Sequence, residues 1–208
     1  MSGRRIGQEI GRIARVQVQQ RSLKVPGPKH RAYDPSGIVR VSRLLLEPEG
    51  VTGIAEDGAA VLDVHHLKHP RGKGRGDNGI CFGFTSHYEA MRARMPGLED
   101  GMAGENLLIE SDRMWDIDGV SDGLVVVTAS GKVWLDEVEI APPCPEFARY
   151  ALRFPENARP DQRMIDAVKF LGEGMRGFYA CITGDPGRVS PGDRVHLALV
   201  DPVEGSLW

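Results

Sequence analysis

The sequence predicts a mainly β domain with a few helices, built as a barrel or a sandwich. Strand-like segments recur along the whole chain of 208 residues, and turns rich in Gly, Pro and Asp separate most of them. Three segments have the apolar spacing of a helix. Many short strands punctuated by turns are typical of barrels and sandwiches.

Nine segments are rich in β-branched and other apolar residues, as strands are. In the first, Val16 and Val18 alternate with Gln17 and Gln19, which is the period of a half-buried strand. The predicted strands are residues 12–19, 38–46, 60–64, 80–84, 105–109, 124–128, 133–140, 178–183 and 195–200.

Helices are predicted at residues 86–95, 146–153 and 161–171. Ser86 and Glu89 have the spacing of a capping box at the start of the first helix. In the third, Met164, Ile165, Val168 and Leu171 are expected on one face, and Gly172 follows as a stop signal.

The composition is that of an ordinary soluble domain, with 41% hydrophobic and 26% charged residues. A net charge of −3 gives no general attraction to nucleic acid. No run approaches the ~20 apolar residues of a membrane span, and the first residues lack a secretion signal. We therefore expect a cytoplasmic protein whose 208 residues form a single domain, with neither nucleic acid nor membrane as partner.

Three cysteines without a CxxC pair indicate free thiols. Cys81 and Cys181 lie in apolar strand-like runs and are predicted to be buried and unreactive. Cys144 stands in the segment Ala-Pro-Pro-Cys-Pro-Glu-Phe, where the prolines restrict the backbone and Pro145 suits the first position of a helix. At such an N-cap, the helix dipole favours a thiolate, which is both the nucleophilic and the metal-binding form. The alternative is that Cys144 only fills an apolar corner.

Residues 63–69 bring one carboxylate and three imidazoles together. At a strand end, Asp63 and His65 would share a face and His66 would point the other way. These groups are usual transition-metal ligands, but their irregular spacing favours loop contacts or contacts to an anion over a metal centre.

Two further segments have the composition of ligand-binding loops. Glycines alternate with Arg71, Lys73 and Arg75, so the backbone and the cations can both approach a phosphate. A solvated surface loop is the alternative, since the spacing is not that of a P-loop. Residues 104–106 (Gly104, Glu105 and Asn106) place polar groups at the start of a strand, either as the edge of a ligand site or as a plain turn.

In their order along the chain, these segments resemble the MOSC domain, named for the C-terminal part of molybdenum cofactor sulfurase. The resemblance covers about residues 11–200, the core of the predicted domain. The segments that carry it are Asp63-Val64-His65-His66, His69-Pro70-Arg71, Gly83-Phe84-Thr85-Ser86-His87-Tyr88, Ala103-Gly104-Glu105-Asn106-Leu107, Pro143-Cys144, Arg176-Gly177-Phe178-Tyr179 and Val189-Ser190-Pro191-Gly192-Asp193-Arg194-Val195.

The resemblance implies a closed β-barrel-like fold with peripheral helices and makes Cys144 the family's key thiol. In some members that thiol coordinates molybdenum in a pyranopterin cofactor, and the enzyme reduces N-hydroxylated compounds. We then expect an external electron donor protein. The cofactor-binding residues are predicted to be His65, His66, Arg71, Lys73, Arg75, Gly104, Glu105 and Asn106.

Two other functions are compatible with the same resemblance. One is a sulfur carrier that holds a persulfide on Cys144 and takes it from a sulfur donor protein. The other is a non-catalytic module that binds a pterin-like or phosphorylated small molecule. The chain departs from the best-known reductases at residues 63–66, where they carry a His-Gly-Gly style segment, and it has no recognisable iron–sulfur cysteine set.

Overall fold

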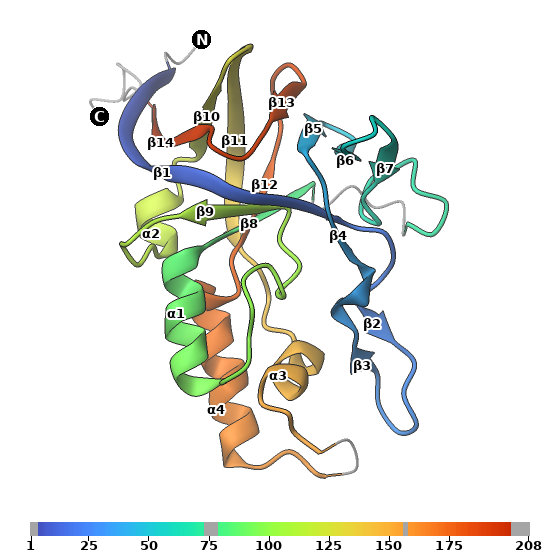
Figure 1. Cartoon of the computed structure of the whole chain (residues 1–208). Helices are drawn as coiled ribbons and strands as arrows, with labels where there is room; N and C mark the ends of the chain where they lie inside the picture. The colour runs from blue at the N-terminus through green and yellow to red at the C-terminus, as the bar shows by residue number, and fades with distance from the viewer. Residues whose placement is uncertain (1–3, 73–78, 156–157, 201–208) are drawn as a thin grey trace, which may run out of the picture.

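The computed structural model describes residues 4–72, 79–155 and 158–200. Its centre is a closed barrel of seven strands, as the resemblance implied (Figure 1). Neighbouring strands are antiparallel except β8 and β9, which are parallel. The order around the barrel is β1 (Arg4–Gln19), β14 (Arg194–Val200), β10 (Leu124–Thr128), β11 (Gly131–Ile140), β12 (Phe178–Cys181), β8 (Ile80–Phe84) and β9 (Leu107–Glu110), which pairs again with β1.

The long strand β1 closes the barrel because it changes neighbours along its length. Its first part pairs with β14, its middle with β9 and its end with β4 (Ile38–Arg40). Register shifts near Glu9, Gly11 and Arg15 mark irregularities that bend the strand. This curvature lets one strand serve three neighbours.

Two smaller sheets flank the barrel. One has the order β13 (Gly187–Val189), β5 (Arg43–Glu47), β6 (Gly50–Ile54) and β7 (Ala60–Leu62), and the other is the hairpin of β2 (Lys24–Val25) and β3 (Ala32–Tyr33). The predicted strand 38–46 is two strands, β4 and β5. The sequence did not predict β2, β3, β6 or β13.

The larger helices lie at one end of the barrel (Figure 1). The helices are α1 (Thr85–Arg94), α2 (Ile117–Val120), α3 (Pro145–Ala151) and α4 (Gln162–Phe170), with a 3-10 turn at Pro35–Gly37 and a π-helical turn at Leu171–Met175. The three predicted helices are present within two residues of their expected bounds. The four-residue α2 is too short for a periodic pattern to reveal it.

The predicted capping box of α1 is wrong. The helix starts directly from the end of β8, so its N-cap is the extended Phe84, which makes no side-chain capping bond. Ser86 is therefore already inside the helix, and its hydroxyl donates to the carbonyl oxygen of Arg113 instead. The side chain of Glu89 is exposed.

The buried side chains form two clusters. One fills the barrel and includes Phe82, Phe84 and Phe178. The other lies among the helices and the β2–β3 hairpin, and Cys144 and Phe147 belong to it. Because burying such side chains contributes about 1.5–3 kcal/mol each, the second cluster holds the helices and the hairpin against the barrel end.

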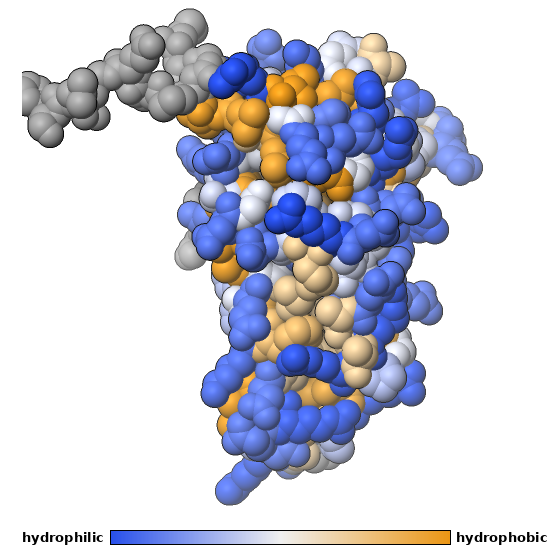
Figure 2. Space-filling model, turned by 90° about the vertical axis from the view of Figure 1, so that its left-hand side faces the viewer, coloured by the Kyte–Doolittle hydropathy of each residue, from blue (hydrophilic) through white to orange (hydrophobic). Residues whose placement is uncertain are grey.

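The face shown in Figure 2 is mostly hydrophilic, with hydrophobic surface gathered near its top. Two exposed side chains at the end of β14, Leu199 and Val200, are 41% and 49% accessible. The β2–β3 hairpin lies on the other side of the molecule (Figure 1). Within the described ranges, no helix is both long enough and apolar enough to cross a membrane.

Candidate functional site

Cys144 is the N-cap of α3, and Pro145 is the first residue of that helix, as predicted. The backbone N–H of Phe147 donates to Cys144 Sγ over 3.4 Å, and the thiol donates to Glu146 Oε2 over 3.3 Å. The side chain is 1% exposed. The helix start therefore holds the buried sulfur with an N–H group, and the Glu146 carboxylate accepts the hydrogen bond of its thiol.

An ion pair covers this thiol from the hairpin side. Lys24 Nζ of β2 lies 3.4 Å from the Glu146 oxygen that accepts from Cys144. Burial alone raises the pKa of Glu146, but hydrogen bonds from its own backbone N–H and from Cys144, and the charge of Lys24, lower it below its usual value. Glu146 therefore carries a negative charge at neutral pH and ties Cys144 to the hairpin.

Arg176 brings a cation to the same region. Its Nη1 donates to the carbonyl oxygen of Pro142 over 3.0 Å, and its buried Nε has no hydrogen-bond partner among the described residues. Burial lowers the pKa of this guanidinium, but Tyr179 and the thiols of Cys81 and Cys144 outweigh burial and raise it. Arg176 is half-buried, and an incompletely bonded guanidinium with a buried Nε can bind an anion here.

Glu105 is a buried carboxyl group with one free oxygen. Its Oε2 accepts from the hydroxyl of Tyr88 over 3.0 Å, and its buried Oε1 has no partner in the described part of the chain. Burial raises the pKa of Glu105 to about 7, against the lowering effects of its backbone N–H, Tyr88, Arg15 and Arg176. Glu105 can therefore both hold and release a proton near neutral pH.

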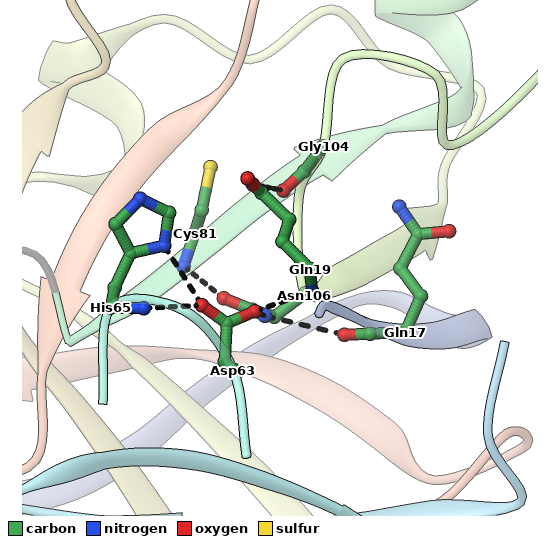
Figure 3. Close-up of polar contacts among 7 residues, drawn as sticks. All are labelled: Gln17, Gln19, Asp63, His65, Cys81, Gly104 and Asn106. Atoms are coloured by element: carbon green, nitrogen blue, oxygen red, sulfur yellow. Dashed lines mark hydrogen bonds and ion pairs between the residues drawn. The ribbon is translucent and has the colours of Figure 1, made fainter. Parts of the chain in front are cut away.

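Asp63 is the centre of a polar network that joins four segments (Figure 3). Its Oδ1 accepts from the backbone N–H of His65 over 2.9 Å and lies 2.8 Å from His65 Nδ1. Its Oδ2 accepts from the N–H of Gln19 over 2.7 Å and from Asn106 Nδ2 over 3.0 Å. Asn106 Oδ1 in turn accepts from the N–H of Cys81 over 3.0 Å. The buried Asp63 therefore orients His65, as the shared-face prediction required.

Gly104 allows the chain to approach this network closely. It has a φ of +89°, and a Cβ here would lie 2.8 Å from Gln19 Nε2. The same Nε2 donates to the carbonyl oxygen of Gly104 over 2.6 Å. Only glycine meets both the backbone and the space requirement, so the motif Gly-Glu-Asn places Glu105 and Asn106 in the interior.

Cys81 connects the two parts of the site. Its N–H binds Asn106 of the Asp63 network, and its thiol is electrostatically coupled to Arg176 and Glu105. Cys81 and Cys181 are half-buried, so the prediction that both are buried is wrong. Desolvation is nevertheless the main cause that raises the pKa of Cys81 to about 12 and raises that of Cys181. Cys81 and Arg176 therefore link three predicted site residues, namely Glu105, Asn106 and Cys144. Asn106 in turn connects them to His65 through Asp63.

The structure does not bring His66 into this group. Its side chain is 2% exposed and points toward Glu47, with 3.7 Å between Nε2 and Oε2. Arg71 is an exposed residue whose N–H donates to His69 Nδ1. Lys73 and Arg75 lie outside the described residues. In the described part of the chain, no three His, Cys, Asp or Glu side chains converge as a metal site.

Three charged residues near Cys144 were not predicted as site residues, namely Arg176, Lys24 and Glu146. Arg176 was present in the segment Arg-Gly-Phe-Tyr that contributed to the resemblance, and this was the only signal for it. Lys24 and Glu146 are ordinary charged residues in sequence, and only the position of the β2–β3 hairpin beside α3 brings them together.

A protein-family model named "MOSC domain" matches residues 65–196. The chain belongs to the MOSC domain family. This family is associated with the molybdenum cofactor. A search of curated proteins finds no match.

Two solved structures share the fold with this MOSC protein. The YuaD protein from Bacillus subtilis has a TM-score of 0.56 and 14% identity, over 95% of this chain and 98% of that chain. YiiM from Geobacillus stearothermophilus has a TM-score of 0.50 and 16% identity, over 89% of this chain and 74% of that chain. At these identities the likeness shows the fold alone.

Proposed function

We propose that this MOSC protein binds a molybdenum cofactor through Cys144 and reduces N-hydroxylated compounds. The observation that carries the proposal is the position of Cys144, whose sulfur receives the Phe147 N–H at the start of α3. A soft thiolate held by backbone geometry is a strong ligand for such a metal. Family membership supports the cofactor in general, and the reaction is our inference.

The surrounding residues fit an anionic cofactor. Arg176 Nε and Glu105 Oε1 are buried polar atoms without partners among the described residues, and such atoms are costly unless a ligand satisfies them. Arg176 would bind a negatively charged group, and His65, oriented by Asp63, would offer its Nε2. When bound, the cofactor supplies two-electron redox chemistry.

In the proposed reaction, an N–O bond breaks and an N–H bond forms, with the oxygen leaving as water. This consumes two electrons, which an external donor protein must provide, and two protons. Glu105 is a suitable source of one proton because its pKa is about 7. The ion pair between Lys24 and Glu146 covers Cys144, so its opening and closing would regulate access to the thiol.

Sulfur transfer is less well supported. A carrier must present its persulfide to another protein, whereas Cys144 is 1% exposed and shielded by Glu146.

The proposal is tested by turnover of an amidoxime with a chemically reduced viologen as electron donor. Protein from a cofactor-producing host should form the amidine, and Cys144→Ala protein should not. Equal turnover by both proteins would refute Cys144 as the ligand.

A further inference from the structure

A pocket with a volume of about 280 Å³ lies between the β2–β3 hairpin and α3. The tip of the hairpin forms one wall, and α3 with the residues after it forms the other. Glu146 belongs to this wall and also accepts the hydrogen bond of Cys144. The pocket therefore opens beside the thiol but is not the buried cluster of Arg176 and Glu105.

The pocket has aromatic walls. Tyr33, which is 7% exposed, has its ring centroid 5.1 Å from that of Phe147 and 5.5 Å from that of Tyr150. Its hydroxyl donates to the carbonyl oxygen of Met102 over 2.7 Å. This hydrogen bond and the two ring contacts fix the position of the Tyr33 side chain. Phe154 adds another aromatic side chain to the lining. Such rigid surfaces suit a planar ligand.

The pocket is also strongly positive. Its lining contains Lys29, Arg31, Arg149 and Arg153, against the single carboxylate of Glu146, which Lys24 already neutralises. Arg149 donates to two backbone carbonyls, which leave its charge uncompensated. Among the described residues, none of these four lining cations forms an ion pair with a carboxylate.

We propose that this pocket binds a small aromatic molecule with a negative charge, such as an aryl carboxylate or sulfonate. The aromatic side chains would contact the ring of the ligand, and the cations would select its charge. Glu146 connects the pocket to Cys144. We therefore assign the pocket as the substrate-binding part of the proposed active site. This last assignment rests on the proposed function, whereas the ligand class does not.

The test is calorimetric titration of the full-length, cofactor-free protein with 1-naphthalenesulfonate and with the neutral 1-naphthalenesulfonamide. The anion should bind at least about tenfold more tightly, because the pocket is lined by several cations that have no carboxylate partner among the described residues. Equal affinity for the two probes, or no binding of the anion, would overturn the proposal.

Two variants separate the contributions of charge and of the aromatic wall. Arg153 has a φ of +50°, so Arg153→Asn removes the charge with a residue that tolerates this backbone. It should weaken sulfonate binding roughly fivefold and leave sulfonamide binding unchanged. Tyr150→Leu should weaken both probes. Lys132→Gln, an exposed cation on β11, is the matched control and should change neither affinity. Unchanged binding in both pocket variants would overturn the assignment.

The titration is then repeated with protein that carries the cofactor. Retained sulfonate binding supports a substrate pocket, whereas loss of binding would mean that the cofactor itself occupies this space and would overturn the substrate assignment. Failure of the protein to acquire molybdenum would refute the proposed function but would not alter the results with cofactor-free protein.

Discussion

Glu146 Oε2 accepts a hydrogen bond from the Cys144 thiol over 3.3 Å. The same oxygen lies 3.4 Å from Lys24 Nζ, so one carboxylate connects α3 to the β2–β3 hairpin. The thiol that the family resemblance marks as the key residue is thus closed off by a contact between two charged side chains. Ion pairs of this kind at half-exposed positions contribute little to stability and can open readily.

Access to Cys144 should therefore depend on Lys24. In Lys24→Met protein, we expect iodoacetamide to modify Cys144 several times faster than in the wild type, because Glu146 loses the contact that holds it. Lys132→Met, which changes an exposed lysine on β11, is the control and should leave the rate unchanged. Peptide mass spectrometry measures the rates, and equal rates in all three proteins would contradict a covering role for Lys24.

Cys144 should also be the first of the three thiols to react. Burial raises the pKa of Cys81 to about 12 and raises that of Cys181, so both have little thiolate at neutral pH. Cys144 instead receives an N–H at a helix start. Preferential labelling of Cys81 or Cys181 would show that the reactive thiol has been misassigned.

Glu105 should make stability depend on pH. Its pKa is about 7 in the folded protein and 4.5 in a free side chain. Between pH 4.5 and about 7, Glu105 is protonated in the folded protein but ionised in the unfolded chain. Its contribution to the free energy of unfolding is therefore fully present below pH 4.5 and is lost as the pH rises through about 7. The loss should reach about 3 kcal/mol in the free energy of unfolding.

Urea unfolding should be measured across this pH range. The free energy of unfolding should change less with pH for Glu105→Gln than for the wild type. Glu110→Gln is the control, because Glu110 is an exposed carboxylate on the adjacent strand β9. Parallel profiles for the wild type and Glu105→Gln would mean that Glu105 is ionised in the folded protein.

Asp63 should be important for stability as well as for orienting His65. Asp63→Ala leaves the N–H of Gln19 and the amide of Asn106 without their acceptor. We expect a loss of about 3 kcal/mol in the free energy of unfolding, because buried donors would be left unpaired. Asp122→Ala changes an exposed aspartate and should cost less than about 0.5 kcal/mol. Similar losses in both variants would contradict the central position of Asp63.

The basic segment after His69 remains a candidate phosphate site. Replacing Arg71, Lys73 and Arg75 together with Ala should weaken binding of inorganic phosphate or of the cofactor. The melting temperature should change little, because charged side chains at the surface, such as Arg71, contribute little to stability. Unaltered affinity in the triple variant would assign this segment to a solvated loop.

The sequence predicted the barrel strands well where β-branched runs lie between turns. Strands β8 and β10 have the predicted bounds, and Cys144 and Pro145 start α3 as expected. It missed β6, whose sequence Gly-Val-Thr-Gly-Ile contains two glycines, and it missed the two-residue strands of the β2–β3 hairpin. Such short or glycine-containing strands depend on their neighbours in the sheet rather than on local propensity.

The site was only partly predictable for a related reason. The pairing of Asp63 with His65 follows from their spacing along the chain. The contact of Arg176 with Pro142 and that of Lys24 with Glu146 depend on segments that are far apart in sequence. A single sequence identifies their residue types but does not show which of them share an interior.

The central claim is that Cys144 holds a molybdenum centre, and elemental analysis of purified protein tests it most directly. Protein made in a host with abundant cofactor should contain molybdenum close to one atom per chain. Cys144→Ala should stay folded, because loss of this small side chain costs about 1–2 kcal/mol, and should contain almost none. Wild-type protein without molybdenum, or a Cys144→Ala variant that retains it, would contradict the account.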